Sequence, residues 1–298
     1  MWPQGRCAWT RGAIVNFSSE MWNPTKMPAI SISFNRYFCL LVLTATTFPA
    51  FAAEIPTLTD TQKEWLGNRI YQNECNARFE CLTSWNAGED FPSLGIGHFI
   101  WYRADQTEIF EETFPQLLAH YRAQSIALPD WIEALPGDDS PWPSRDSFLA
   151  AQDEDRLVTL REFLATTRGT QVDFIAARLT RQLPELLQTA APNMRDTIAR
   201  RFYAIANASP PYGLYALIDY LHFKGSGVNP AERYGGQGWG LLQVLAHMEQ
   251  DSLPAFSAAA AAILEQRVHN APEQRNEQRW LAGWHNRVRG YLPSQTDP

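Results

Sequence analysis

Residues 74–102 read ECNARFECLTSWNAGEDFPSLGIGHFIWY, and this stretch decides how the front of the chain is interpreted. Glu74 ends a segment whose apolar residues recur at helical spacing. Residues 76–92 are polar and contain glycine, which is typical of loops and turns. Residues 93–102 are rich in β-branched and aromatic residues, so we expect a strand there. The order is therefore helix, acidic residue, loop and strand.

Alternation along this strand would place Gly95 and Gly97 on one face, together with Ser93 and Trp101. Two glycines leave bare backbone that a ligand or another backbone can approach closely. A bulge or tight strand packing is the structural alternative. The opposite face is apolar apart from His98, for which we expect a structural role in the core.

The rest of the chain has mostly helical patterns. Thr59 is a suitable N-terminal cap for the first helix. Pro115 is expected to kink or break the second helix. Residues 225–240 form a glycine-rich loop. Helices are expected over residues 59–74, 110–123, 155–167, 171–189, 194–207, 214–221, 240–250 and 255–269, with a last one carrying Trp280 and Trp284. The predicted class is α+β, mainly helical with one small β element near the front.

The N-terminus has the pattern of a secretory signal peptide. Residues 37–45, YFCLLVLTA, are uncharged and apolar, Arg36 precedes them, and an A-x-A site ends at Ala52. The apolar run is shorter than the roughly 20 residues of a spanning helix. We therefore expect two parts, an extension with signal peptide over 1–52 and one domain over 53–298. The predicted location is periplasmic or secreted, with no integral membrane segment after cleavage.

Charge and cysteine content narrow the function classes. The chain carries a formal net charge of −7, and an acidic surface argues against a nucleic-acid partner. Cys75 and Cys81 remain after signal cleavage, an even number in an oxidising compartment, which favours a disulfide over two free thiols. No C-x-x-C, H-E-x-x-H or histidine cluster is present, so we expect no metal and no other cofactor.

Residues 93–98, SLGIGH, resemble the T-I-G-I-G-H element of the phage-type lysozymes (endolysins). The resemblance implies a lysozyme-like fold, in which a glutamate at the end of the first helix precedes this element. It implies that Glu74 is the catalytic general acid. Ser93 stands in place of the family's threonine, which positions the attacking water, and His98 matches a structural histidine.

The chain departs from the family at the second acid. Ala87 stands where the family has an aspartate, and Glu89 or Asp90 is the nearest substitute. Glycoside cleavage needs one carboxylic acid that donates a proton and a second carboxylate that activates water or stabilises positive charge. The negative end of a helix dipole disfavours an ionised carboxylate, which suits Glu74 as the proton donor.

Substrate contacts are predicted in two stretches. Sugar rings stack on aromatic side chains, and amides bind their hydroxyl and acetamido groups. This favours Trp85, Asn86 and Trp101, with Gly95 and Gly97, although such rings also pack in cores. The second stretch, residues 220–243, contains many glycines, and its G-L-L-Q resembles the G-L-M-Q of lytic transglycosylases. Its candidate ligand contacts are Lys224, Glu232, Arg233, Trp239 and Gln243.

The predicted function is a peptidoglycan-active glycosidase, either a hydrolase or a lytic transglycosylase, whose partner is the glycan strand. One alternative is a module that binds glycan without cleaving it, which the missing aspartate favours. The other is an envelope assembly protein that uses Trp280 or Trp284 on a protein partner.

Overall fold

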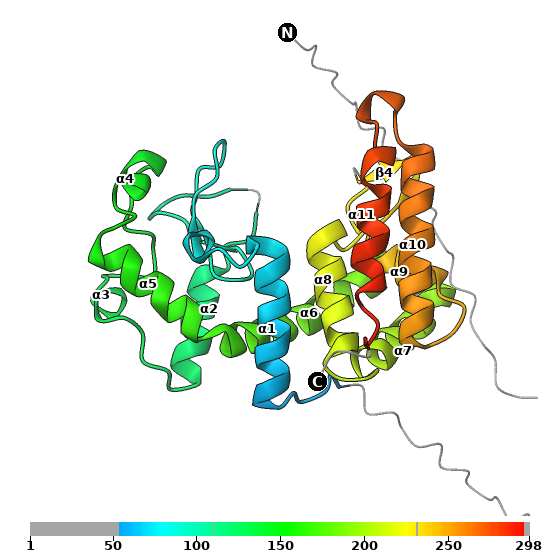
Figure 1. Ribbon diagram of the computed structural model, residues 1–298, viewed down its shortest axis with the longest axis horizontal. Coiled ribbons are helices and arrows are strands. Elements are labelled where there is room, and N and C mark those ends of the chain that lie inside the picture. The colour runs from blue at the N-terminus through cyan, green and yellow to red at the C-terminus, as the bar shows by residue number, and fades with distance from the viewer. Residues whose placement is uncertain (1–53, 109, 231, 295–298) are drawn as a thin grey trace, which may run out of the picture. The chain divides into compact units, whose positions relative to one another are not determined.

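The computed structural model describes residues 54–108, 110–230 and 232–294 (Figure 1). The predicted signal peptide and its cleavage site after Ala52 lie outside the described residues. None of the helices in the described part of the chain combines the length and apolar character that crossing a membrane requires.

Helix α1 (Asp60–Cys75) forms as the sequence predicts. The Thr59 side chain accepts a hydrogen bond from the backbone N–H of Gln62, and the Gln62 side chain accepts one from the N–H of Thr59. This reciprocal pair satisfies two backbone donors that the first turn would otherwise leave open. The helix ends where Asn76 takes a left-handed conformation, with φ of 49°. The capping signal and the end of the predicted helix are both confirmed.

The single strand predicted over residues 93–102 is wrong. The structure has two short strands there, β2 (Ser93–Leu94) and β3 (Phe99–Ile100), which pair antiparallel. The four residues between them form a turn, in which Gly95 has φ of 68° and His98 has φ of 47°. Positive φ reverses the chain, so the side-chain alternation of one continuous strand does not apply.

Strand β2 lies at the centre of a three-stranded sheet. It pairs on its other side with β1 (Thr83–Ser84), which follows the 3-10 helix η1 (Phe79–Leu82). A second small hairpin, of β4 (Arg233–Tyr234) and β5 (Gln237–Gly238), lies within the predicted glycine-rich loop. The described structure is thus mainly helical with few strands, which confirms the predicted class, but the second small sheet was not predicted.

Most of the remaining helices follow the predicted segments, but two short ones, at residues 130–133 and 145–150, were not predicted. The remaining helices are α2 (Phe114–Ala123), α3 (Asp130–Glu133), α4 (Arg145–Ala150), α5 (Asp155–Thr166), α6 (Arg168–Thr189), α7 (Arg195–Ala206), α8 (Tyr212–Lys224), α9 (Leu241–His247), α10 (Leu253–Asn270) and α11 (Gln278–Arg289), with 3-10 turns η2 (Pro192–Met194) and η3 (Glu273–Arg275). Pro115 is in the first turn of α2 rather than at a kink, because proline lacks only a backbone donor that the first turn does not use.

The long helix α6 organises the core. It contacts α1, α2, α7 and α8, and Figure 1 shows it passing behind α1 and α8. Leu66 and Ile70 of α1 are buried, as are Val172 and Leu179 of α6. Gly67 allows the close approach of α1 to α6, since a Cβ there would lie 3.2 Å from the Cβ of Arg168. These contacts fix where the end of α1, and therefore Glu74, is held.

Candidate functional site

A buried carboxylate, Asp219 on α8, organises the surroundings of Glu74. Its side chain is 2% exposed. Arg287 of α11 donates to it twice, through Nε at 2.9 Å and Nη2 at 2.8 Å. The Tyr291 hydroxyl donates at 2.7 Å, and the Asn73 amide donates at 2.7 Å. A buried charge is tolerated when it is paired and hydrogen-bonded in this way.

Glu74 joins this cluster through the same guanidinium. Nη2 of Arg287 lies 3.0 Å from Oε1 of Glu74, whose side chain is 24% exposed. Burial acts to lower the pKa of Arg287, but its hydrogen bonds with Asp219 and the charges of Asp219 and Glu74 outweigh burial and raise it. Arg287 is therefore a fixed cation, and Glu74 is a partly accessible carboxylate beside it.

The disulfide predicted between Cys75 and Cys81 is present. It closes a short loop directly after Glu74, which restrains the end of α1. By lowering the entropy of the unfolded chain, the bond stabilises the fold by a free energy on the order of 2 kcal/mol. Nε2 of His98 lies 3.9 Å from the Cys75 sulfur and 3.7 Å from the Cys81 sulfur. Among the described residues, Cys75, Cys81 and His98 form the group of potential metal ligands whose ligand atoms lie close together. The two sulfurs of this group are bonded to each other in the disulfide.

The glycines of the SLGIGH element serve the protein's own packing. A Cβ on Gly95 would overlap the side-chain oxygen of Gln171, and one on Gly97 would lie 2.6 Å from the Phe99 ring. That oxygen of Gln171 accepts a hydrogen bond from the N–H of Ile96 at 2.9 Å. The interpretation of these glycines as a bare wall for a ligand is corrected, because protein atoms already fill the space.

Gln171 was missed by sequence reasoning. Its side chain is fully buried, and its amide also donates to the carbonyl of Leu164 at 2.7 Å. It thereby joins the turn of the front hairpin to α5 and α6. The available signal was a lone polar residue on the apolar face of a predicted helix, next to Val172 and Ile175. Buried polar groups almost always have such partners.

The aromatic residues predicted to stack on sugars belong to the core. Trp101 is fully buried and Trp85 is 5% exposed. The indole N–H of Trp101 donates to the carbonyl of Asp138, and that of Trp85 donates to the carbonyl of Glu89. Both rings are enclosed, so their predicted role as stacking surfaces is corrected.

The remaining front residues lie in or beside the loop before β2. The Asn86 amide donates to the Glu89 carboxylate at 3.2 Å, and both are at least partly exposed. Asp90 is exposed, whereas Ser93 is 5% exposed within the sheet. The side-chain hydrogen bond of Glu89 therefore lies within its own loop.

The glycine-rich stretch is pinned by Gln243. Its side-chain oxygen accepts from the N–H of Gly240 at 2.9 Å, and its amide donates to the carbonyl of Gly227 at 3.1 Å. Trp239 is 9% exposed. Glu232 is partly buried and Arg233 is exposed. The Gln243 amide thus holds the loop in place. Of the side chains of Glu232, Arg233, Trp239 and Gln243, that of Arg233 is the exposed one.

A second charged cluster holds this loop to the C-terminal helices. Glu277 has a fully buried carboxylate that accepts from Arg267 at 2.8 and 3.0 Å, from Arg275 at 3.1 Å and from the Tyr234 hydroxyl at 3.0 Å. Burial acts to raise the pKa of Glu277, but the hydrogen bonds and charge of Arg267, with those of the other donors, lower it to about 2. Glu277 could not be identified from the sequence, because it lies in a strongly polar segment where nothing distinguishes it from its neighbours.

Lys224, at the end of α8, is 8% exposed. Its ammonium lies 3.4 Å from the ring centre of Trp284 and 4.0 Å from that of Phe223. Burial lowers the pKa of Lys224 to about 7, and the charges of Arg267 and Arg287 act in the same direction against Glu277. The predicted ligand contact is therefore a buried cation among aromatic rings.

Two hollows are relevant to ligand binding. One of about 270 Å³ lies between α6 and the end of α8 and is lined by Arg178, Gln182, His222 and Ser226, among others. His222 is within electrostatic reach of Glu74, so this hollow is the one near the cluster.

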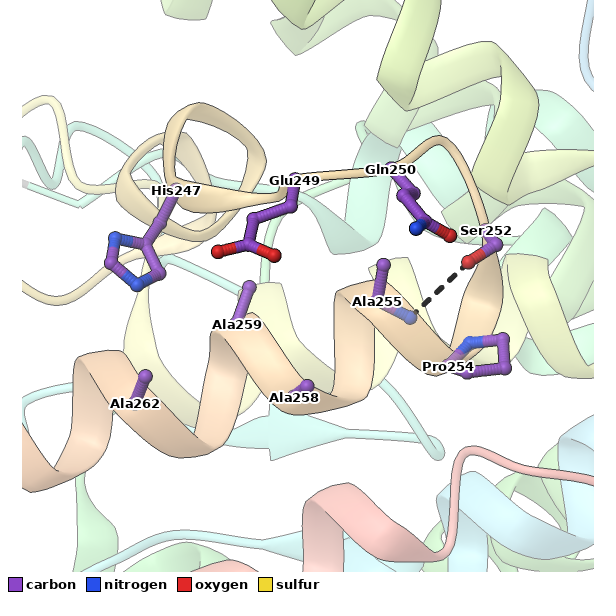
Figure 2. A pocket seen from close by; sticks show the side chains of 9 residues that line it. All are labelled: His247, Glu249, Gln250, Ser252, Pro254, Ala255, Ala258, Ala259 and Ala262. Carbon is purple, nitrogen blue, oxygen red and sulfur yellow. Dashed lines mark hydrogen bonds between the residues drawn. The ribbon is translucent and has the colours of Figure 1, made fainter.

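The other hollow, of about 410 Å³, lies over α10. Figure 2 shows His247 and Glu249 above the row of alanines on this helix, with Ser252 capping it. It shares no lining residue with the Glu74 cluster, and its floor of alanine methyl groups carries no chemistry.

Comparison of the chain with models of known protein families found no match, and comparisons with curated proteins and with solved structures found none either.

Proposed function

We propose that this protein has a lysozyme-like fold and cleaves the glycan strands of peptidoglycan, with Glu74 as the general acid. The observation that carries the proposal is the placement of Glu74. Its carboxylate stands partly exposed at the end of the first helix, restrained by the adjacent disulfide, and the SLGIGH hairpin turn follows with His98 against that disulfide.

In this mechanism the Glu74 carboxyl donates its proton to the glycosidic oxygen as the bond to the sugar carbon breaks. The resulting positive charge on the sugar is quenched by water in a hydrolase, or by the substrate's own hydroxyl in a lytic transglycosylase. Glu89 or Asp90 would supply the second carboxylate. Asp219 is unsuited to that role, because its oxygens already accept four hydrogen bonds.

The ion pair with Arg287 sets a condition on this mechanism. A proton donor must be uncharged, whereas a guanidinium at 3.0 Å is a partner for a carboxylate. Asp219 holds Arg287 from two sides, so the arginine has an alternative partner. Substrate binding must therefore separate Glu74 from Arg287 while Arg287 stays on Asp219.

The test is digestion of purified sacculi by the exported protein, with the products identified by mass. A reducing sugar end indicates a hydrolase, and an anhydro end indicates a transglycosylase. Glu74→Gln should lower the release of muropeptides by a factor on the order of 100 or more, since general acids contribute at least that much. Glu80→Gln, an exposed change in the same disulfide loop, is the matched control. No release by the unmodified protein would refute the proposal.

The Glu74–Arg287 ion pair also favours a second candidate, a protein that binds glycan strands without cleaving them. In that case sacculi retain the protein but stay intact. Glu74→Gln would then leave the affinity for sacculi unchanged and no products would form with either protein.

A further inference from the structure

His222, near the end of α8, is reached by water and yet surrounded by protein. The residue is exposed, and it lines the hollow of about 270 Å³ between α6 and the end of α8. Protein atoms nevertheless crowd its ring, and burial is the main cause that lowers its pKa. A side chain with both properties lies on the wall of a cleft rather than on a convex surface.

This cleft is close to the Glu74 cluster. His222 follows Asp219 by three residues, which is about one helical turn, so the two side chains leave α8 on the same side. Asp219 holds Arg287, and Arg287 contacts Glu74. The ring of His222 is accordingly within electrostatic reach of both Glu74 and Asp219. Helix α8 therefore brings an imidazole into the neighbourhood of the proposed general acid.

The fold does not engage the ring nitrogens of His222. Within the described chain they make no hydrogen bond and no ion pair, whereas His285 contacts Glu265 and His98 lies against the disulfide. Polar side chains that serve only the fold are normally hydrogen-bonded within it. An exposed ring whose nitrogens have no protein partner is available to water or to a ligand in the hollow.

The proposed mechanism needs a group of this kind. Besides the proton donor, direct attack by water on a glycosidic bond requires a base that activates the water. Ser93, the residue that the resemblance assigns to positioning water, is 5% exposed, and the side-chain hydrogen bond of Glu89 lies within its own loop. An imidazole accepts a proton near neutral pH, because its ordinary pKa is about 6.5.

We propose that His222 is the general base of the glycan-cleaving reaction and that the protein is an inverting hydrolase. The inference rests on the proposed function and assigns its second catalytic group to α8 instead of to Glu89 or Asp90. A ring nitrogen takes a proton from water as the water oxygen bonds to the anomeric carbon. The glycosidic bond breaks, its electron pair stays on the leaving oxygen, and Glu74 gives that oxygen a proton. Solvent then carries the proton from His222 back to Glu74.

The reaction requires that Glu74 and His222 are both uncharged before the bond breaks. The charged and titratable groups around the ring of His222 are Arg178 and Glu185 of α6, Glu74 of α1, Asp219 of α8 and His98 of the front turn. Burial lowers the pKa of His222 and outweighs the carboxylates of Glu74 and Asp219, which act to raise it. A substrate that fills the cleft removes further water from acid and base, and this disfavours the ionised form of each.

The experiment compares the exported protein with its His222→Gln variant in the digestion of purified sacculi. Since a general base contributes about 100-fold or more, kcat should fall by at least that factor, while the affinity for sacculi stays the same. His247→Gln is the matched control and should keep full activity. His247 is also exposed and lines the hollow over α10, which shares no lining residue with the Glu74 cluster.

Three further measurements separate a base from a residue that only supports the fold. The dependence of kcat/KM on pH should be bell-shaped in the unmodified protein, and His222→Gln should lose the limb on the acidic side. Added imidazole should restore part of the activity of His222→Ala and none of that of Glu74→Gln. The new sugar ends, followed by nuclear magnetic resonance directly after cleavage of a soluble glycan fragment, should carry the inverted anomer.

Full activity in His222→Gln, anhydro sugar ends or retention of the anomeric configuration would each overturn the inference. All three outcomes leave cleavage by Glu74 intact, so they are distinct from a failure of the proposed function. Absence of cleavage by the unmodified protein would refute both. Loss of activity in Glu74→Gln and in His222→Gln, with His247→Gln active, is the result that we expect.

Discussion

Replacing Asp219 by asparagine tests whether the buried cluster holds the site together. The substitution keeps the size of the side chain but removes its charge and turns one acceptor oxygen into a donor. The oxygen Oδ2 accepts from Nε of Arg287 and from the Tyr291 hydroxyl, so an amide nitrogen placed there would face two donors. An amide nitrogen at the Oδ1 position would instead face Asn73 and Nη2 of Arg287.

The magnitude follows from burial. Asp219 is 2% exposed, and breaking a buried ion pair by removing one partner costs about 3–5 kcal/mol, because the other charge is left uncompensated. Arg287 retains Glu74, which is 24% exposed and a weaker partner. We therefore expect Asp219→Asn to lower the free energy of unfolding by about 3 kcal/mol or more, a large share of the roughly 5–15 kcal/mol of a typical domain.

Asp138→Asn is the matched control. Asp138 accepts two hydrogen bonds from Arg122, as Asp219 does from Arg287, but the two side chains are 34% and 37% exposed. Exposed pairs contribute about 0–1 kcal/mol. Urea unfolding followed by tryptophan fluorescence, with the disulfide intact, gives both values. Equal losses in the two variants would refute the reasoning that burial makes the Asp219 cluster structurally decisive.

Two further predictions concern stability. Gly95→Ala should destabilise the fold by about 1–3 kcal/mol more than Gly88→Ala. Both glycines have positive φ, but only at Gly95 would the new methyl group collide with another side chain, that of Gln171. Equal shifts of the melting temperature in calorimetry would contradict this. Burial acts to raise the pKa of Glu277, but the hydrogen bonds and charge of Arg267 lower it to about 2, compared with 4.5 in the unfolded chain. It therefore contributes about 3 kcal/mol that is fully present above pH 4.5 and lost as the pH falls toward 2. Glu277→Gln should flatten the dependence of unfolding free energy on pH in that window, and an unchanged slope in acid titrations would count against the assignment.

The helices and the disulfide could be predicted because their signals are local. Thr59, a residue type suited to the N-terminal cap, marks the start of α1, and apolar spacing marks its buried face. The pairing of Cys75 with Cys81 follows from parity and a short loop. The strand over residues 93–102 failed because composition favours extended backbone there but does not reveal the positive φ of Gly95 and His98. The reversal depends on Gln171, which the sequence places far away.

By itself the sequence determined the helical class, the position of Glu74 at the end of the first helix and the loop that the disulfide closes. Only the tertiary structure decided which groups surround Glu74. Arg287 lies 213 residues from Glu74 and 68 from Asp219, and Lys224 meets Trp284 across two helices. Local periodicity encodes which face of a helix is buried. The pairing of buried charges depends on how helices pack against each other, and that packing arises only when the whole core forms.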